Sequence, residues 1–169
     1  MSTAHSFQLE DGTPVLVSIE DAELVRSYKW HILQGHNGKL YVVANTKPSM
    51  TYMHRLIAGT PRGMETDHIN GNGLDNRRSN LRIATPSQNS ANTGKPKRPN
   101  GERHTSQFKG VSWDKSRGKW QAKITVARKC RNLGRYEVEA DAARAYDNAA
   151  VEAWGQFATL NAGPMEEAA

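Results

Sequence analysis

The chain has 169 residues, of which 37% are hydrophobic and 24% charged. This length suits one medium domain or two small ones. No apolar run approaches the roughly 18 residues that a membrane span needs, and residues 1–20 lack the apolar core of a signal peptide. The single cysteine, Cys130, excludes a disulfide framework and a multi-cysteine zinc site. These features predict a soluble, cytoplasmic protein with no membrane partner.

Charge is distributed unevenly along the chain, whose formal net charge is +6. Residues 95–135 contain 13 Lys and Arg but only two acids, Glu102 and Asp114. Residues 136–169 contain seven acids and one basic residue, Arg144. A basic block that also holds tryptophans is typical of a protein that binds a polyanion. The alternative is a solvated basic surface with no partner.

The N-terminal part has the composition of several short strands. A helical stretch is expected from Ser18 to about Trp30. The segments with strand character are residues 7–9, 15–17, 30–33, 40–44, 51–57 and 81–83. Residues 67–80 are rich in Asn, Asp and Gly, which predicts a loop.

A helix is predicted to begin at Thr85-Pro86-Ser87-Gln88 and to end near Gly94. Thr85 suits the N-cap, Pro86 the first helical position, and Gln88 completes a capping box. Residues 95–106 carry Pro, Gly and charge without periodicity, so they are interpreted as a linker.

The C-terminal part has the clearest pattern, because apolar and polar residues alternate over residues 119–126. Two neighbouring runs, residues 108–113 and 131–136, can flank this strand in an antiparallel sheet. A helix is expected over residues 139–154, with Gly155 just beyond it. The apolar stripe of this helix is Val138, Ala142, Ala145, Tyr146, Ala149 and Ala153. Trp120 and Trp154 are assigned to the core, which leaves the other face of the sheet free and basic.

Four polar residues could form a phosphodiesterase site: Asp67, His68, Asn80 and Asn89. A histidine can act as general base near neutral pH. A carboxylate and an amide oxygen suit a hard cation such as Mg²⁺ or Mn²⁺. On residue types alone, His68 could equally be a packing histidine. A calcium loop is excluded because the twelfth residue from Asp67 is an arginine, and a zinc finger is excluded for lack of cysteines.

The motif stretches YMHRLI (52–57), TDHINGN (66–72), LDNRRSNLR (74–82) and QNSAN (88–92) resemble the HNH homing endonucleases. The resemblance implies a ββα-metal fold in which His68 activates the attacking water. Asp67 and Asn89 would hold one divalent cation, and Asn80 would brace the loop that carries His68. The third motif position is Asn89 instead of His, as in the phage-intron branch of the family, which favours Mg²⁺ or Mn²⁺.

Neighbouring residues on a regular strand point to opposite faces, so Asp67 and His68 can both face a metal only if the backbone bends. The glycines that follow permit such a bend. His54 and Arg82 are candidates for support of the site. A purely structural role is an equal alternative for His54.

The stretches FKGV (108–111), GKWQAKI (118–124), LGRY (133–136) and EADAARAYD (139–147) are similar to the plant ethylene-response-factor (Apetala-type) DNA-binding domain. That family places a three-stranded sheet in the major groove with a helix behind it. The resemblance implies DNA contacts at Lys109, Trp113, Lys115, Arg117, Lys119, Lys123, Arg128, Lys129, Arg131 and Arg135. Asn132 and Lys123 depart from the family pattern, so the plant target sequence does not transfer.

Together these observations predict an α+β protein with an N-terminal ββα-metal nuclease unit and a C-terminal three-stranded antiparallel sheet with one packed helix. The expected bounds are a nuclease domain at 1–94 with its core at about 50–94, a basic linker at 95–106, a DNA-binding domain at 107–163 and a tail at 164–169. The predicted function is site-directed cleavage of double-stranded DNA by a monomer or dimer in a bacterial cell or phage-infected host. The alternatives are an inactive sequence-specific DNA-binding protein and a non-specific nuclease of restriction or repair type.

Overall fold

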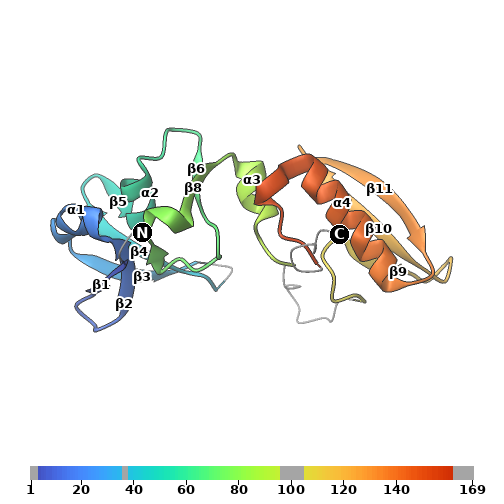
Figure 1. The fold of residues 1–169 in the computed structure, drawn as a ribbon, viewed down its shortest axis with the longest axis horizontal. Coiled ribbons are helices and arrows are strands. Elements are labelled where there is room, and N and C mark those ends of the chain that lie inside the picture. The colour runs from blue at the N-terminus through green and yellow to red at the C-terminus, as the bar shows by residue number, and fades with distance from the viewer. Residues whose placement is uncertain (1–3, 36–37, 96–104, 162–169) are drawn as a thin grey trace, which may run out of the picture. The chain divides into compact units, whose positions relative to one another are not determined.

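The computed structural model describes residues 4–35, 38–95 and 105–161 (Figure 1). The chain forms two compact units, Met1–Pro86 and Ser87–Ala169. Both mix short sheets with few helices, which confirms the predicted α+β class. The linker residues 96–104 and the predicted tail at 164–169 lie outside the described residues, and the proposed domain bounds stay a prediction. No helix in the described ranges is long and apolar enough to cross a membrane.

In its described residues, 4–35 and 38–86, the first unit has three small sheets and two α-helices. The strands pair in the orders β1-β2-β7, β3-β4-β5 and β6-β8, and β2 pairs with β7 in parallel. The elements are β1 (Ala4–Gln8), β2 (Pro14–Ser18), the 3₁₀ turn η1 (Ile19–Asp21), α1 (Ala22–Arg26), β3 (Trp30–Gln34), β4 (Leu40–Thr46), β5 (Ser49–Tyr52), α2 (Met53–Ala58), β6 (Glu65–His68), β7 (Asp75–Asn76), the 3₁₀ turn η2 (Arg78–Asn80) and β8 (Leu81–Ala84).

Residues before position 50 supply most of the core of this unit. Its buried members are Leu9, Val15, Val17, Val25, Trp30, Val42, Ala44, Met53 and Ile57. The last two come from α2, and Leu74 and Leu81 from the motif region pack against the same cluster. The N-terminal strands therefore support β6, β8 and the segment between them, residues 69–80, which we call the motif loop.

Two expectations for this unit were wrong. Residues 51–57 are not one strand, because β5 ends at Tyr52 and α2 follows. Met53 and Ile57, four positions apart, are buried together, and Gly59 ends the helix in the left-handed conformation (φ 59°). The helix expected up to Trp30 stops at Arg26, and Trp30 is instead the first residue of β3. The indole N–H of Trp30 donates to the Val25 carbonyl near the end of the helix (2.7 Å).

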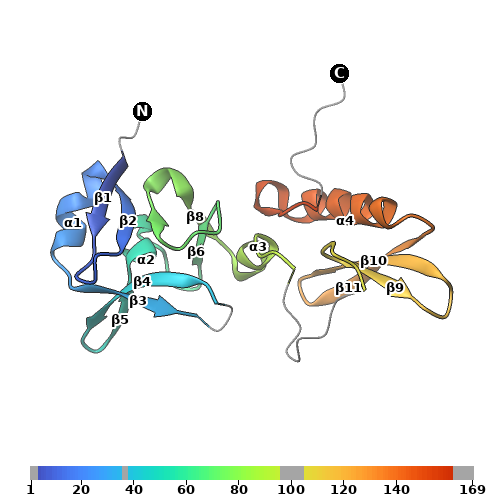
Figure 2. The same cartoon turned by 90° about the horizontal axis from the view of Figure 1, so that it is seen from below.

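The second unit places one long helix on one face of an antiparallel sheet, as predicted (Figure 2). The strand order is β11-β10-β9. The elements are α3 (Pro86–Ala91), β9 (Val111–Asp114), β10 (Lys119–Val126), β11 (Lys129–Tyr136), α4 (Glu139–Trp154) and the 3₁₀ turn η3 (Gly155–Phe157). Ala122 and Ile124 are buried against α4, and Trp120 and Trp154 pack at the edges of this core.

The apolar stripe of α4 is shorter than predicted. Ala142, Tyr146 and Ala149 are buried, whereas Val138 is 54% exposed and Ala153 is also exposed. Val138 has extended backbone angles as the N-cap residue, so it lies outside the helical repeat.

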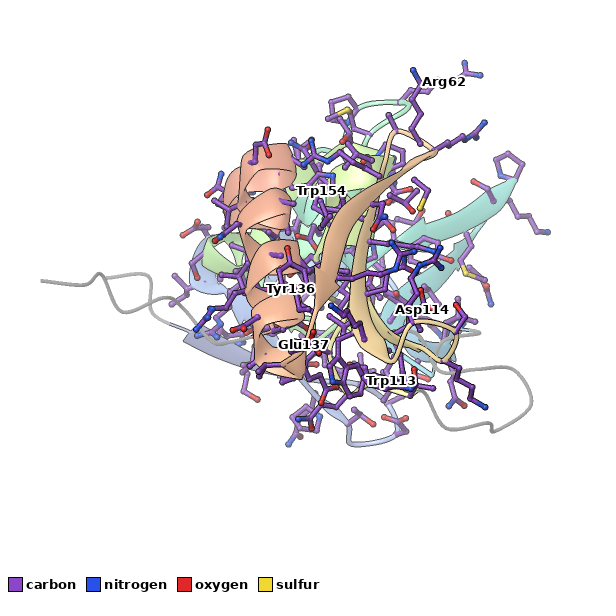
Figure 3. The ribbon with its side chains drawn as sticks, turned by 90° about the vertical axis from the view of Figure 1, so that its right-hand side faces the viewer. Arg62, Trp113, Asp114, Tyr136, Glu137 and Trp154 are labelled. Carbon is purple, nitrogen blue, oxygen red and sulfur yellow. The ribbon has the colours of Figure 1, made fainter. Side chains whose placement is uncertain are left out.

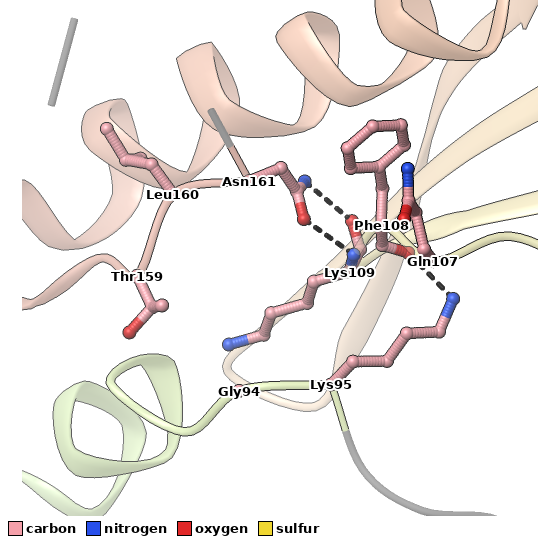
Figure 4. A pocket seen from close by; sticks show the side chains of 8 residues that line it. All are labelled: Gly94, Lys95, Gln107, Phe108, Lys109, Thr159, Leu160 and Asn161. Atoms are coloured by element: carbon pink, nitrogen blue, oxygen red, sulfur yellow. Dashed lines mark hydrogen bonds between the residues drawn. The ribbon is translucent and has the colours of Figure 1, made fainter. Parts of the chain in front are cut away.

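Helix α3 is held at both ends by its own unit. At its C-terminal end, the Lys109 ammonium donates to the carbonyls of Ala91 (2.8 Å) and Thr93 (2.6 Å). At its N-terminal end, the Trp154 indole donates to the Ser87 hydroxyl (3.2 Å). The side chain of Asn161 fixes the backbone of Lys109: its Oδ1 accepts from the Lys109 N–H (2.6 Å) and its Nδ2 donates to the Lys109 carbonyl (3.0 Å). Both residues line a cavity of about 290 Å³ (Figure 4).

Candidate functional site

His68 is the last residue of β6 and is buried, with 6% of its surface exposed. Its Nε2 lies 3.2 Å from Asn76 Oδ1, on the fully buried strand β7. The Asn76 Nδ2 donates to the carbonyl of Gly73 (3.3 Å), which turns the amide oxygen toward the imidazole. Because that oxygen can only accept, Nε2 carries the proton and the lone pair lies on Nδ1. This tautomer is the one that a general base acting through Nδ1 requires.

A second buried histidine, His54 of α2, packs edge to face against His68. The ring centroids are 5.0 Å apart at an interplanar angle of 75°. Burial, and secondarily the neighbouring His68, lowers the pKa of His54 to about 3. Burial also lowers the pKa of His68, against the opposing effects of Asn76, Asp67 and Asp75. Both rings are therefore neutral near pH 7, as a proton acceptor must be.

Asp67 precedes His68 on β6 and is 4% exposed. It lies opposite Arg82 of β8, whose Nε donates to its Oδ2 (2.7 Å) while Nη2 forms a salt bridge with the same oxygen (2.7 Å). Register pairing is regular through both Asp67 and His68, so the bend that would let both side chains face one metal does not occur within β6. The chain turns immediately afterwards, where Gly71 has φ 72°.

Asn80 connects the two ends of the motif loop. Its Oδ1 accepts from the backbone N–H of Asn70 (3.0 Å), and its Nδ2 donates to Asn70 Oδ1 (3.0 Å) and to the Asp75 carbonyl (2.7 Å). Its own carbonyl accepts from the Ile69 N–H (2.9 Å). The first unit thus places Asn80 across the loop that follows His68, whereas the regular pairing of β6 directs the side chains of Asp67 and His68 to opposite faces.

Asn89 lies on α3 and belongs to the second unit. Its pairing with Asp67 at one cation therefore stays a prediction. Among the described residues there is no group of three or more His, Cys, Asp or Glu that could hold a metal ion. The predicted ligands are instead one carboxylate and one amide.

These donors fit a hard divalent cation in kind. Carboxylate and amide oxygens are the ligands that Mg²⁺ and Mn²⁺ prefer, with water and phosphate oxygens completing the shell. The Asp67 carboxylate can accept about four hydrogen bonds or ligands. Arg82 and a cation can therefore share it.

Nine of the ten residues predicted to contact DNA fall into three groups. Strand register places Lys119, Lys123 and Arg135 on the sheet face opposite α4, and Lys115 and Arg117 lie in the β9–β10 turn beside that face. Trp113, Lys129 and Arg131 are on the α4 side, where Arg131 pairs with Glu152 of α4 (3.2 Å) and Trp113 packs on Trp120. Arg128 lies in the β10–β11 turn.

Lys109 is engaged elsewhere, because its ammonium donates to the carbonyls at the end of α3. Burial lowers its pKa. Contact with DNA stays a prediction for all ten residues.

Asn76 lies within the motif stretch 74–82, but the sequence predicted no role for it. Its importance depends on β7, a two-residue strand that pairs in parallel with β2 and was not predicted. The signal that could have found it is an asparagine among apolar core positions beside a candidate base. A buried amide must be hydrogen-bonded, and the histidine is the partner that a catalytic loop would offer.

Comparison with known proteins identifies the class of this fold and site. Residues 51–91 match a family model described as HNH endonuclease. The chain is 31% identical over 156 residues to a protein of Acanthamoeba polyphaga mimivirus that is named an HNH endonuclease, covering 89% of this chain and 75% of that protein. It is also 41% identical over 73 residues to Protein 3.8 of Escherichia phage T7, covering 43% of this chain and 56% of the phage protein. No solved structure shows a significant match.

The chain belongs to the HNH endonuclease family, whose members are DNA-cleaving nucleases that in general depend on a divalent metal ion. The matched region contains α2, β6, the motif loop, β8 and α3, and so includes His54, His68, Asn76 and Asn89.

Proposed function

We propose that this protein is a site-directed DNA endonuclease of the homing type, which hydrolyses a phosphodiester bond with His68 as general base. The observation that carries the proposal is the hydrogen bond between His68 Nε2 and the buried Asn76 (3.2 Å). It selects the tautomer whose Nδ1 can take a proton from water. Burial lowers the pKa of His68, which keeps its ring in the accepting form at neutral pH.

The motif loop holds this base in place. Asn80 spans the loop from Asn70 to Asp75 with three side-chain hydrogen bonds, which tie together the two ends of the segment between His68 and Asn76. We assign Asn80 this bracing role, and Asn76 the orientation of the ring. Arg82 neutralises and orients Asp67.

One divalent cation, Mg²⁺ or Mn²⁺, would be held by Asp67 and Asn89. When bound, such a cation stabilises negative charge on the phosphate and on the leaving oxygen. The protein supplies hard oxygen donors for it, and Arg82 leaves acceptor capacity on the Asp67 carboxylate. His54 is assigned a supporting role, because its neutral ring packs against His68 without adding charge.

The second unit would bind duplex DNA through the sheet face opposite α4, as its resemblance to the Apetala-type domain implies. Support comes from the basic residues on that face and from the 13 basic residues within 95–135. Since phosphate contacts give affinity that falls with salt, this unit would supply much of the binding energy. The occurrence of its relatives in a phage and a giant virus is consistent with a mobile-element nuclease.

The decisive experiment is cleavage of supercoiled plasmid DNA with Mg²⁺ or Mn²⁺. We expect nicked or linear product that disappears with EDTA and in His68→Ala. His31→Ala is the matched control, since His31 is an exposed histidine on β3 and should leave cleavage unchanged. Cleavage that survives His68→Ala would contradict the mechanism.

Two other outcomes would favour the alternatives. Salt-sensitive DNA binding without cleavage, on plasmids carrying DNA of the source organism, would indicate an inactive binding protein. Equal cleavage at all sequences would indicate a non-specific nuclease.

A further inference from the structure

Asp114 is an acidic residue on the basic face of the second unit, where Glu137 also pairs with Lys119 (2.8 Å). Asp114 ends β9 and, by register, lies opposite Lys119 of β10, on the sheet face away from α4 (Figure 3). A negative charge on a surface that binds a polyanion lowers affinity. Its position there therefore calls for a specific interaction that offsets this cost.

Both carboxylate oxygens of Asp114 are engaged by neighbouring side chains. Oδ2 accepts from Arg135 Nε (2.9 Å) and lies 3.5 Å from Arg117 Nη1. Oδ1 accepts from the Ser116 hydroxyl (2.7 Å). The hydrogen bonds from Ser116 and then Arg135 hold the pKa of Asp114 well below its usual range, so the carboxylate stays charged.

The Asp114–Arg135 pair spans the central strand of the sheet. Asp114 comes from β9 and Arg135 from β11, where it lies opposite Gln121 of β10 on the same face. Gln121 lies on the face away from α4 and is only 9% exposed. The pair therefore lies across the face that the resemblance to the Apetala-type domain places against DNA.

Arginine reads guanine by donating two parallel hydrogen bonds to O6 and N7 in the major groove. This contact needs a fixed guanidinium, and Arg135 has its Nε committed to Asp114. Its four remaining N–H groups are on Nη1 and Nη2, for which the described residues supply no hydrogen-bond acceptor. The contact with Asp114 thus restricts this side chain in the free protein, which lowers the entropy that it loses on binding.

We propose that Asp114 is a positioning residue that orients Arg135 to read one guanine, and that this pair sets sequence specificity at one position of the target. The inference rests on the proposed function of the sheet as a DNA-binding surface. It makes Arg135 a contact of a different kind from Lys119 and Lys123, whose ammonium groups would bind phosphates without discriminating between bases.

Positioning and simple charge predict different sequence preferences for Asp114→Asn. If Asp114 contributes only charge, the variant binds all duplexes more tightly and keeps its sequence preference. If Asp114 orients Arg135, the variant gains affinity for unselected DNA but loses discrimination at one base pair. A bidentate arginine–guanine contact corresponds to about 5- to 150-fold discrimination.

The test is selection from duplexes with a randomised centre, using the full-length protein without divalent metal. The wild type is expected to enrich sequences with one guanine that Asp114→Asn no longer requires. Arg135→Lys, which keeps the charge but not the planar fork, should lose the same preference. Asp141→Asn is the matched control, because Asp141 is also an ion-paired acid, bound to Arg144, but lies on α4 and not on the proposed DNA-binding face. Thermal melting of each variant verifies that it is folded.

Three outcomes separate the inference from the function on which it rests. Loss of preference at the same position in Asp114→Asn and Arg135→Lys supports the inference. Unchanged preference in Asp114→Asn overturns it, whatever Arg135→Lys does, and leaves DNA binding by the sheet intact. Absence of any sequence preference in the wild type contradicts the proposed function of the sheet, and the inference with it.

Discussion

Gly73 and Leu40 approach each other so closely that a Cβ atom on Gly73 would lie 2.0 Å from the Leu40 carbonyl oxygen. This contact seats the motif loop on β4. The Gly73 carbonyl also accepts the hydrogen bond that orients Asn76. The position of the general base therefore depends on a residue with no side chain.

We expect Gly73→Ala to destabilise the protein by about 1–3 kcal/mol, since backbone cannot move aside cheaply. It should also slow plasmid cleavage, because a displaced Gly73 carbonyl releases Asn76. Urea unfolding and initial cleavage rates measure the two effects. Gly94→Ala is the control, since a Cβ there meets nothing within 4 Å. Equal behaviour of the two variants would contradict the role of this contact.

Removal of the Asn76 amide should impair the base directly. In Asn76→Ala the imidazole loses the acceptor that selects its tautomer, and we expect kcat to fall about 10- to 100-fold. KM should change little, because Asn76 is fully buried and cannot contact DNA. Single-turnover cleavage at saturating protein isolates this step. A change confined to KM would show that Asn76 acts on binding instead.

The buried His54 makes stability depend on pH. Its pKa is about 3 in the folded protein and near 6.5 when unfolded, so between these values only the unfolded chain takes up the proton. The contribution of His54 to stability is therefore complete above about pH 6.5 and is lost at up to about 1.4 kcal/mol per pH unit as the solution is acidified. Urea unfolding at pH 7.5 and 5 measures this slope.

His54→Gln removes this titrating group and should make the pH dependence between pH 6.5 and 5 shallower, leaving the contribution of His68, whose pKa burial also lowers. His31→Gln should leave the slope as it is in the wild type, because His31 is exposed. A slope that stays the same in His54→Gln would assign the acid sensitivity to another group.

Sequence patterns predicted the second unit well for a physical reason. The alternation in β10 and the helical repeat of α4 reflect packing between elements that are neighbours in the sequence. The burial of Ala122, Ile124 and Tyr146 therefore follows directly from these two patterns. The pattern failed at Val138, where the helix had not begun.

The first unit was less predictable, because its elements are short and their pairing is non-local. No periodicity can indicate that two residues, Asp75 and Asn76, pair with β2 some 60 positions earlier. The motif predicted the roles of His68 and Asn80 because both residues border one loop that is continuous in the sequence. The role of Asn76 needed the three-dimensional structure.

Lys109 connects the sheet of the second unit to α3, and its loss should loosen that helix. Lys109→Met keeps the length of the side chain but leaves the carbonyls of Ala91 and Thr93 without its ammonium. We expect a loss of about 1–3 kcal/mol in the free energy of unfolding. Hydrogen exchange at the α3 amides should quicken, whereas Lys29→Met, at an exposed lysine, should change neither measurement.

The β10–β11 turn stores strain that can be removed by substitution. Ala127 (φ 48°) and Arg128 (φ 64°) both have left-handed backbones, which a two-residue hairpin turn of type I′ requires but which cost an L-residue about 1–2 kcal/mol each. Asparagine tolerates this conformation, so Ala127→Asn should raise the free energy of unfolding by about 0.5–1 kcal/mol. Arg128→Gly should stabilise similarly but weaken DNA binding if Arg128 contacts phosphate. Ala140→Gly, on the exposed side of α4, is the contrasting control and should destabilise by about 0.5–1 kcal/mol. Loss of stability in Ala127→Asn would show that the turn is not strained.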